Sequence, residues 1–200
     1  WVCPVRLPGR EARAAEAPFE RMAPLVDALA AAIEPYTGGP FAFFGHSMGA
    51  AVAFELAREL RRRRLPLPKM LIASAARAPQ FRRGHVPPPP PSDDEFRAEL
   101  QRLEGMPPGI LADSDAMRVV IPALRADAAL YRTYIYTEGA PLDVPIRAYG
   151  GAEDPRIGTE FLHGWAEQTT ASFAVRLFPG GHFYLNDSAP VVAAIEEDLR

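Results

Sequence analysis

The chain has 200 residues, of which 48% are hydrophobic and 24% charged, and its 22 basic and 25 acidic side chains give a net charge of −3. This composition is typical of one folded domain with a sizeable core, and it excludes disorder as the general state. The near balance of charge argues against nucleic-acid binding as the main function. The single cysteine, Cys3, excludes an internal disulfide framework, and no Cys/His cluster suggests structural zinc. No apolar run approaches the length needed to span a bilayer.

Short apolar stretches alternate with stretches of helical periodicity along most of the chain. We expect strands at 1–5, 41–44, 70–74, 146–149 and 175–178, and helices at 19–34, 48–64, 161–169 and 190–199. The run at 41–44 is apolar throughout, which is typical of a strand buried on both faces. Strands that alternate with helices predict an α/β fold with a mainly parallel sheet.

Residues 80–140 interrupt this alternation, because no strong strand signal lies between Ala78 and Pro141. We interpret them as an all-helical insertion into a core formed by residues 1–79 and 141–200. The insertion is either a packed helical hairpin without a special role or a lid over a functional site.

Three local signals describe the insertion in more detail. Five consecutive prolines at 87–91 predict a stiff polyproline II segment. Ser92, followed three residues later by Glu95, forms a capping box that predicts a helix start, with an apolar stripe at Phe96, Leu100 and Leu103 that ends at Gly105. A second helical stretch runs from Met117 to Tyr131, and we expect Pro122 to kink or divide it.

The segment around Ser47 has the pattern of a nucleophile elbow, a sharp strand-to-helix turn that presents a serine. Gly45, Ser47 and Gly49 form Gly-x-Ser-x-Gly between an expected strand and an expected helix. Because glycines lack Cβ atoms, we expect both to let the helix and the sheet approach closely. Ser47 then lies at a helix N-terminus, where free N–H groups favour developing negative charge, and by position the Met48 N–H is one oxyanion donor. An ordinary serine in a turn is the alternative, which the flanking strand and small-residue helix disfavour.

A serine nucleophile needs a base and a carboxylate that orients the base. In this architecture both follow the serine in the order carboxylate, histidine, at the ends of later strands. Asp154 follows the expected strand at 146–149, and His182 follows the one at 175–178. We therefore predict His182 as the general base and Asp154 as its orienting carboxylate, with Gly180 and Gly181 letting the imidazole come close.

Other candidates for these roles are weaker. Glu153 is the nearest alternative carboxylate, but Pro155 fixes the turn directly after Asp154 and favours the latter. His46 adjoins the serine, and since such a neighbour points elsewhere, we expect it to be packed or hydrogen-bonded locally. Four further residues receive no catalytic role in this interpretation: Cys3, His85, Asp143 and His163.

The ordered set of motifs resembles the stand-alone, or type II, thioesterases of non-ribosomal peptide and polyketide synthesis, within the α/β-hydrolase superfamily. The resemblance runs along essentially the whole chain. It is carried by Leu7–Glu11, Phe44–Ala50, Phe54–Ala57, Arg77–Pro79, Asp93–Phe96, Leu124–Asp127, Gly150–Pro155 and Phe178–Phe183. The family's nucleophile, acid and base fall on Ser47, Asp154 and His182.

The resemblance implies a function that spacing alone does not reveal. The expected reaction is hydrolysis of acyl or aminoacyl thioesters on the phosphopantetheine arm of carrier proteins, which removes misprimed groups from synthases. It implies that the insertion is a lid and that the protein is a cytoplasmic monomer without metal or organic cofactor. Arg61–Arg64 and Arg82–Arg83 are candidates for contact with an acidic carrier, although cations also suit a helix C-terminus. The alternatives are a chain-releasing thioesterase, a small-molecule esterase and an inactive fragment.

One departure from the family pattern concerns the N-terminus. In the family, first strands and a loop with the second oxyanion N–H precede the motif that Leu7–Glu11 matches, and no such segment precedes it here. Without a neighbour for the strand at 41–44, several backbone groups would lack partners, at about 1–3 kcal/mol each. We therefore expect further chain upstream in the natural protein, and we expect these 200 residues not to be competent alone.

Overall fold

The computed structural model describes the backbone of residues 1–102 and 114–200 and the side chains of residues 1–100 and 117–200. The predictions for Leu103 and Gly105 therefore fall outside the described residues. The chain forms two compact units, one made of residues 1–25 and 86–134 and the other of residues 26–85 and 135–200. No helix within the described ranges is long and apolar enough to cross a bilayer.

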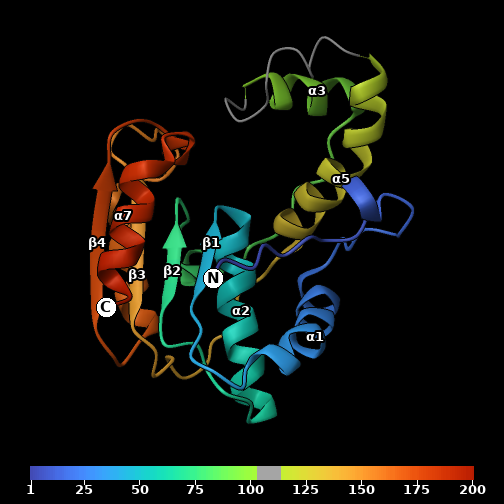
Figure 1. Ribbon diagram of the computed structural model, residues 1–200. Coiled ribbons are helices and arrows are strands. Elements are labelled where there is room, and N and C mark those ends of the chain that lie inside the picture. Colours follow the sequence, from blue (N-terminus) through green and yellow to red (C-terminus); the bar gives the residue numbers. More distant parts are fainter. Residues whose placement is uncertain (103–113) are drawn as a thin grey trace. The chain divides into compact units, whose positions relative to one another are not determined.

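The second unit is built on a four-stranded parallel sheet (Figure 1). Its strands, in the spatial order β1-β2-β3-β4, are β1 (Phe43–His46), β2 (Leu71–Ser74), β3 (Ile146–Gly151) and β4 (Phe173–Phe178). The observed sheet confirms the predicted parallel α/β architecture. Since all four strands run the same way, their carboxyl ends meet at one edge of the sheet.

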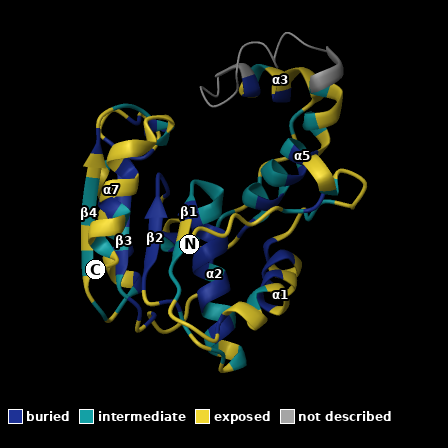
Figure 2. Cartoon of the chain, in the orientation of Figure 1, coloured by how far each residue is buried: buried dark blue, intermediate teal, exposed yellow. Residues whose placement is uncertain are grey.

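Helices of this unit follow three of the four strands, β1, β3 and β4. They are α2 (Met48–Arg63), which contacts β1 and β2, α6 (Thr159–His163), which contacts β3 and continues as the 3-10 turn η4 (Gly164–Gln168), and α7 (Ser188–Asp198). Val191 and Ala194 of α7 belong to one buried cluster with Ile72, Tyr149 and Phe178 of the strands. Figure 2 shows that β2 is buried along its whole length, as expected of an inner strand.

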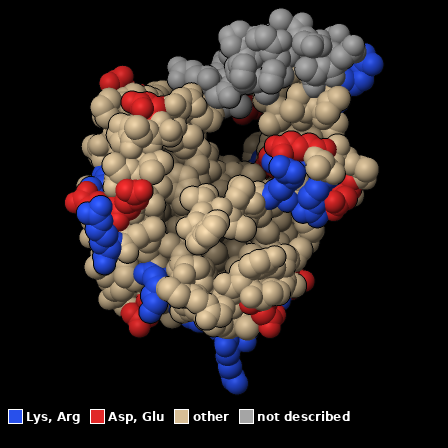
Figure 3. Space-filling view, viewed as in Figure 1, with Lys and Arg blue, Asp and Glu red and all other residues tan. Residues whose placement is uncertain are grey.

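Charged side chains fasten the last turn of α7 to the sheet. Arg147 of β3 and Arg176 of β4 both donate to the Asp198 carboxylate, and the Tyr149 hydroxyl donates to it at 2.5 Å. Figure 3 shows charges of both signs gathered over β4 and α7. Burial alone would raise the pKa of Asp198, but the hydrogen bonds from Arg176 and Tyr149 outweigh it and lower that pKa.

The first unit contains the helices of the insertion together with the start of the chain. They are α3 (Asp93–Arg102) and α5 (Ser114–Thr133), and a 3-10 turn, η1 (Glu11–Arg13), precedes α1 (Met22–Ile33), which spans both units. Arg10 donates to both carboxylate oxygens of Asp127, at 3.0 and 2.7 Å. This bidentate pair ties the N-terminal segment to α5.

The predicted capping box of the insertion is confirmed. The Glu95 N–H donates to Ser92 Oγ at 3.3 Å, and the Ser92 N–H donates to the Glu95 carboxylate at 2.8 Å. Pro122 does not divide the second helix, because α5 continues through it as one element. Phe96 and Leu100 of the predicted apolar stripe are buried.

Two strand predictions were wrong. Residues 1–5 form no strand, and Trp1, Val2 and Val5 are exposed, because hydrophobicity makes a strand only where a neighbouring strand pairs with it. The strand expected at 41–44 begins at Phe43, and it is not buried on both faces, since Phe44 is 43% exposed. Within the described part of the chain β1 pairs with β2 alone, so its other edge has no ladder.

Helix boundaries differ from prediction where a tighter turn takes over. The helix expected at 19–34 is α1, followed by the 3-10 turn η2 (Glu34–Tyr36), which continues through Pro35. The helix expected at 161–169 is shared between α6 and η4. In both places the tighter turn keeps a helical path after the α-helix ends.

Candidate active site

Ser47 occupies the sharp turn between β1 and α2. Its backbone has φ 54° and ψ −117°, a conformation that side chains rarely adopt. The Ser47 N–H donates to the Ser74 carbonyl at 2.7 Å, which ties the turn to the end of β2. Ser47 therefore projects from the carboxyl edge of the sheet, and Met48 begins the helix whose first N–H groups have no partner within the helix.

Only one of the two motif glycines is required by close packing. A Cβ on Gly45 would lie 2.2 Å from the carbonyl oxygen of Gly49 and 2.6 Å from the nitrogen of Ala50, so β1 and α2 pack backbone to backbone there. A Cβ on Gly49 would meet nothing within 4 Å. The expectation that both glycines allow the approach was thus wrong for Gly49, whose own Cβ position faces open space.

The loops after β3 and β4 also pack main chain against main chain. A Cβ on Gly151 would lie 2.1 Å from the Gly181 carbonyl oxygen, so only glycine fits there. The Ala152 N–H donates to Phe178 at 2.8 Å, and the Glu153 N–H donates to Gly180 at 3.0 Å. Gly180 has φ +104°, which favours glycine. Gly151 was not singled out from the sequence, although the Gly150-Gly151 doublet was the available signal.

Ser47 and Asp154 each lie within hydrogen-bonding distance of His182 at this edge. His182 Nδ1–H donates to Asp154 Oδ2 at 2.6 Å, and the Ser47 hydroxyl donates to His182 Nε2 at 3.1 Å. The backbone N–H of Arg156 donates to Asp154 Oδ1 at 2.9 Å. Both Asp154 and His182 are buried. Both Asp154 oxygens thus accept hydrogen bonds, which fixes the carboxylate that faces the imidazole.

The alternative residues lie elsewhere or face away. Glu153 and Asp143 are exposed, as are Cys3 and His163. His85 follows the 3-10 turn η3 (Pro79–Arg82), and its N–H donates to the Arg82 carbonyl. The structure therefore brings Asp154, and not Glu153, to His182.

His46 lies close to these three residues, but the hydrogen bond of its ring is with Ser74. Its Nδ1 lies 2.8 Å from Ser74 Oγ, and its ring centroid lies 5.2 Å from that of His182. Burial, followed by the charge of His182, lowers the pKa of His46 to about 4. The local hydrogen bond agrees with the expectation for this residue, whereas the roles of Ser74 and Tyr184 beside it had no signal in the sequence.

Four of the six arginines considered for partner contact make side-chain bonds within the chain. Arg61 donates to the carbonyls of Ala140 and Pro141, Arg62 pairs with Glu59, Arg63 pairs with Glu59 and Asp27, and Arg83 pairs with Glu138. Within the described residues no group of His, Cys, Asp and Glu side chains is arranged to hold a metal ion.

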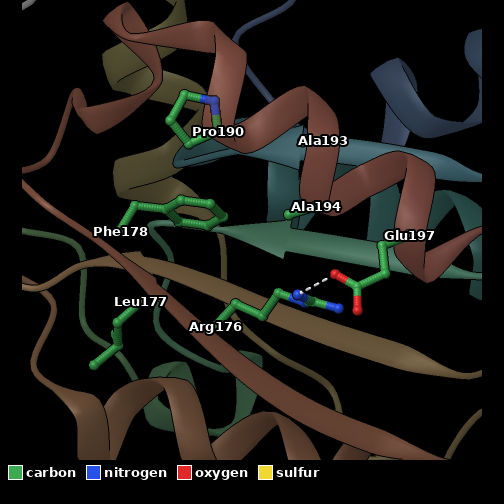
Figure 4. A pocket seen from close by; sticks show the side chains of 7 residues that line it. All are labelled: Arg176, Leu177, Phe178, Pro190, Ala193, Ala194 and Glu197. Carbon is green, nitrogen blue, oxygen red and sulfur yellow. Dashed lines mark hydrogen bonds and ion pairs between the residues drawn. The ribbon is translucent and has the colours of Figure 1, made fainter.

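A separate pocket lies between β4 and α7. Its lining residues are Arg176, Leu177, Phe178, Pro190, Ala193, Ala194 and Glu197, and Arg176 pairs with Glu197 at its rim (Figure 4). None of Ser47, Asp154 and His182 lines this pocket. Its lining combines one ion pair with apolar side chains and shows no converging catalytic groups.

Comparison with known proteins now identifies the family. A model of the thioesterase domain matches residues 1–199. The chain is 40% identical over 187 residues to the gramicidin S biosynthesis protein GrsT of Aneurinibacillus migulanus, covering 94% of this chain and 73% of that protein.

Two solved structures show the same fold. The thioesterase RedJ from the prodiginine pathway of Streptomyces coelicolor has a TM-score of 0.87 and 36% identity, over 96% of this chain and 77% of that one. The type II thioesterase BorB from the borrelidin cluster has a TM-score of 0.85 and 36% identity, over 98% and 80%. The chain accordingly belongs to the thioesterase family, has the α/β-hydrolase fold, and is a thioester hydrolase whose relatives are type II thioesterases of non-ribosomal peptide and polyketide pathways.

Proposed function

We propose that Ser47, His182 and Asp154 are the catalytic nucleophile, general base and orienting carboxylate of this thioesterase. The observation that carries the proposal is the position of the His182 ring, whose Nε2 lies 3.1 Å from Ser47 Oγ while Nδ1 lies 2.6 Å from Asp154 Oδ2. An ionised carboxylate accepts hydrogen bonds only, so Asp154 holds the proton of His182 on Nδ1. The lone pair of Nε2 then faces the serine hydroxyl, as a base requires.

In the first half of the reaction, Ser47 Oγ attacks the thioester carbonyl carbon while its proton moves to His182 Nε2. Negative charge develops on the carbonyl oxygen, and we assign the Met48 N–H, which belongs to the first residue of α2, as a donor to it. When the tetrahedral intermediate collapses, the C–S bond breaks and the imidazolium returns its proton to the departing thiolate. A thiol with a pKa of about 8.5 is a good leaving group, so the acyl-serine forms readily.

In the second half, water replaces the thiol. His182 takes a proton from the water as its oxygen attacks the acyl-serine carbonyl, and the same donor stabilises the second oxyanion. Collapse breaks the bond to Ser47 Oγ, which recovers its proton from His182. The products are a carboxylic acid and the regenerated serine, and no redox partner or cofactor enters the balance.

We infer that the substrate is an acyl or aminoacyl group held as a thioester on the phosphopantetheine arm of a carrier protein. Support comes from relatives that are named for gramicidin S, prodiginine and borrelidin biosynthesis. In this proposal the enzyme edits synthases by removing misprimed groups, and it works as a cytoplasmic monomer. The role of residues 80–140 as a lid belongs to the same proposal and rests on the resemblance in sequence.

The catalytic assignment is tested with Ser47→Ala and a serine-directed fluorophosphonate. The wild type and its variants are prepared with further chain upstream of these 200 residues. We expect the fluorophosphonate to label this wild type on the peptide containing Ser47, and we expect turnover of the variant to fall on the order of 10⁶-fold. Ser172→Ala, at an exposed serine, is the matched control and should keep the wild-type rate. Undiminished hydrolysis by the Ser47 variant would end the assignment.

The substrate class is tested by comparing three acyl donors with the same acyl group. We expect kcat/KM to be highest for the acyl-carrier protein, lower for acyl-pantetheine and lowest for a nitrophenyl ester. A preference for the free ester would favour a small-molecule esterase. Cyclisation or release of full-length chains in place of misprimed groups would favour a chain-releasing thioesterase.

A further inference from the structure

Beside the three proposed catalytic residues lies a second, separate set of hydrogen-bonded polar side chains, which are His46, Ser74 and Tyr184, and of these His46 is half-buried. His46 Nδ1 is 2.8 Å from Ser74 Oγ, and Ser74 Oγ is 2.5 Å from the Tyr184 hydroxyl. Ser74 is fully buried and Tyr184 nearly so. Buried polar groups are costly unless they are paired, so the two hydrogen bonds that join these side chains specify one local arrangement.

This set of side chains spans the same edge of the sheet as the catalytic groups. His46 ends β1, Ser74 ends β2, and Tyr184 begins the 3-10 turn η5 (Tyr184–Asn186). Tyr184 comes two residues after His182, so its hydroxyl connects the segment that carries the base to the inner strand β2. The Tyr184 ring also stacks on Phe178 of β4, with centroids 5.0 Å apart and planes 3° from parallel.

His182 packs against the other end of this set. Its ring centroid lies 5.2 Å from that of His46, and Phe183 lies 5.8 Å from His46 on the same segment. The hydrogen bond to Ser74 orients the His46 ring, and this ring packs against the His182 ring. Tyr184 therefore contacts the backbone segment that carries His182, and His46 contacts the His182 ring itself.

The His46 ring must be uncharged, because the neighbouring His182 becomes cationic during the proposed reaction. His46 Nε2 is buried and has no hydrogen-bond partner among the described residues. A protonated ring would leave that N–H as a buried donor without an acceptor, whereas a neutral ring with its proton on Nδ1 pairs its one donor with Ser74 and leaves only the Nε2 lone pair unpaired. The charged and titratable groups that act on His46 are His182, Asp154 and Arg156, and burial is the largest cause of its low pKa.

We propose that Tyr184, acting through Ser74 and His46, is a positioning residue that holds the His182 imidazole within reach of Ser47. The proposal rests on the catalytic roles proposed above and deepens them. It assigns a kinetic purpose to a hydroxyl that touches neither the substrate nor the reacting atoms. A displacement of about 1 Å can cost on the order of 10²-fold in rate, which sets the upper limit for losing this restraint.

The test replaces Tyr184 by phenylalanine, which removes the hydroxyl and keeps the ring on Phe178. We expect kcat to fall about tenfold with KM nearly unchanged, and we expect the rate of fluorophosphonate labelling at Ser47 to fall in parallel. Tyr149→Phe is the matched control, because Tyr149 also packs against Phe178, at 5.2 Å, while its hydroxyl donates to Asp198 instead. The control should lose thermal stability and keep the wild-type kcat.

A second variant and the double variant complete the test. Ser74→Ala removes the hydroxyl that bonds both His46 and Tyr184, so we expect it to lower kcat at least as much as Tyr184→Phe. The double variant should be no slower than Ser74→Ala alone, because both changes remove one connection. Circular dichroism and thermal unfolding identify any variant that fails to fold.

The possible outcomes separate this proposal from the one before it. If the wild type is not labelled at Ser47, the catalytic assignment fails and the positioning role fails with it. If the wild type is labelled and Tyr184→Phe keeps the wild-type kcat and labelling rate, only the positioning role is overturned. A loss of kcat in Tyr184→Phe no greater than in Tyr149→Phe would overturn it as well, since general destabilisation would then explain both.

Discussion

Gly45→Ala is the substitution that most directly tests how the turn that carries Ser47 is built. The added Cβ would lie 2.2 Å from the carbonyl oxygen of Gly49, 2.4 Å from its carbonyl carbon and 2.6 Å from the nitrogen of Ala50. All three are backbone atoms, so no side-chain rotation relieves the contact. Ordinary van der Waals contact begins at 3.4 Å, so the first turn of α2 must move by about 1.2 Å relative to β1.

That displacement has two measurable consequences. Forcing a methyl group into a packed contact costs about 1–3 kcal/mol, so the unfolding free energy should fall by that amount. Ser47 lies between Gly45 and Gly49 and moves with the turn, and a displacement of about 1 Å can cost on the order of 10²-fold in rate. Urea unfolding and the rate of fluorophosphonate labelling measure the two effects separately.

Gly49→Ala is the matched control within the same motif. Its Cβ meets nothing within 4 Å, and alanine is favoured over glycine inside a helix by about 0.5–1 kcal/mol. We therefore expect Gly49→Ala to be as stable as the wild type or slightly more stable, with labelling at Ser47 retained. The reasoning would be refuted if Gly45→Ala matched the wild type in both stability and labelling.

Three further predictions concern strain, capping and pH. Ser47→Gly should unfold with a free energy about 1 kcal/mol higher than Ser47→Ala, since glycine relieves the positive φ at some cost in chain entropy, and equal stabilities in urea would contradict the strain. Ser92→Ala should destabilise the unit that contains α3 by about 1 kcal/mol, because Glu95 loses its capping partner, and local amide exchange measures this. The pKa of Asp198 is lower in the folded than in the unfolded protein, so its stabilising contribution is full above the usual carboxyl pKa and disappears as pH falls through the folded value. Asp198→Asn should therefore lower stability at pH 7 and flatten its decline in acid, and an unchanged pH dependence of unfolding would refute this contribution from the Arg176 and Tyr149 bonds.

The sequence predicts the order of strands and helices well where the signal is local. The apolar runs that became β2 and β3 and the capping box at Ser92 need only neighbouring residues to be recognised. Ser47, Asp154 and His182 each follow an expected strand. Because parallel strands bring their carboxyl ends to one edge of the sheet, the sequence indicates that these residues lie near one another. The sequence thus points to the carboxyl edge before any contact is known.

What the sequence does not reveal depends on contacts between distant segments. The run that became β1 has the composition of an inner strand, yet Phe44 is exposed, because burial depends on neighbours that composition does not specify. The Gly150-Gly151 doublet is visible in the sequence, but the reason that Gly151 must be glycine appears only in the structure, where the Gly181 carbonyl meets it. Ser74 and Tyr184 are 110 residues apart and look ordinary, so their hydrogen bond could not be foreseen.

The meeting of the loops after β3 and β4 has a mechanical consequence. Since Gly151 abuts Gly181 and two main-chain hydrogen bonds join the segments, Asp154 and His182, the proposed acid and base, are held on one connected piece of backbone. We therefore expect their 2.6 Å contact to be little affected by small distortions elsewhere. The distance that can change more easily is the one between His182 Nε2 and Ser47 Oγ, which is 3.1 Å, because Ser47 lies on a different turn. Mutations that change the rate without disrupting the fold are therefore expected to act mainly on this one distance, either from the turn around Ser47 or from the joined segments after β3 and β4.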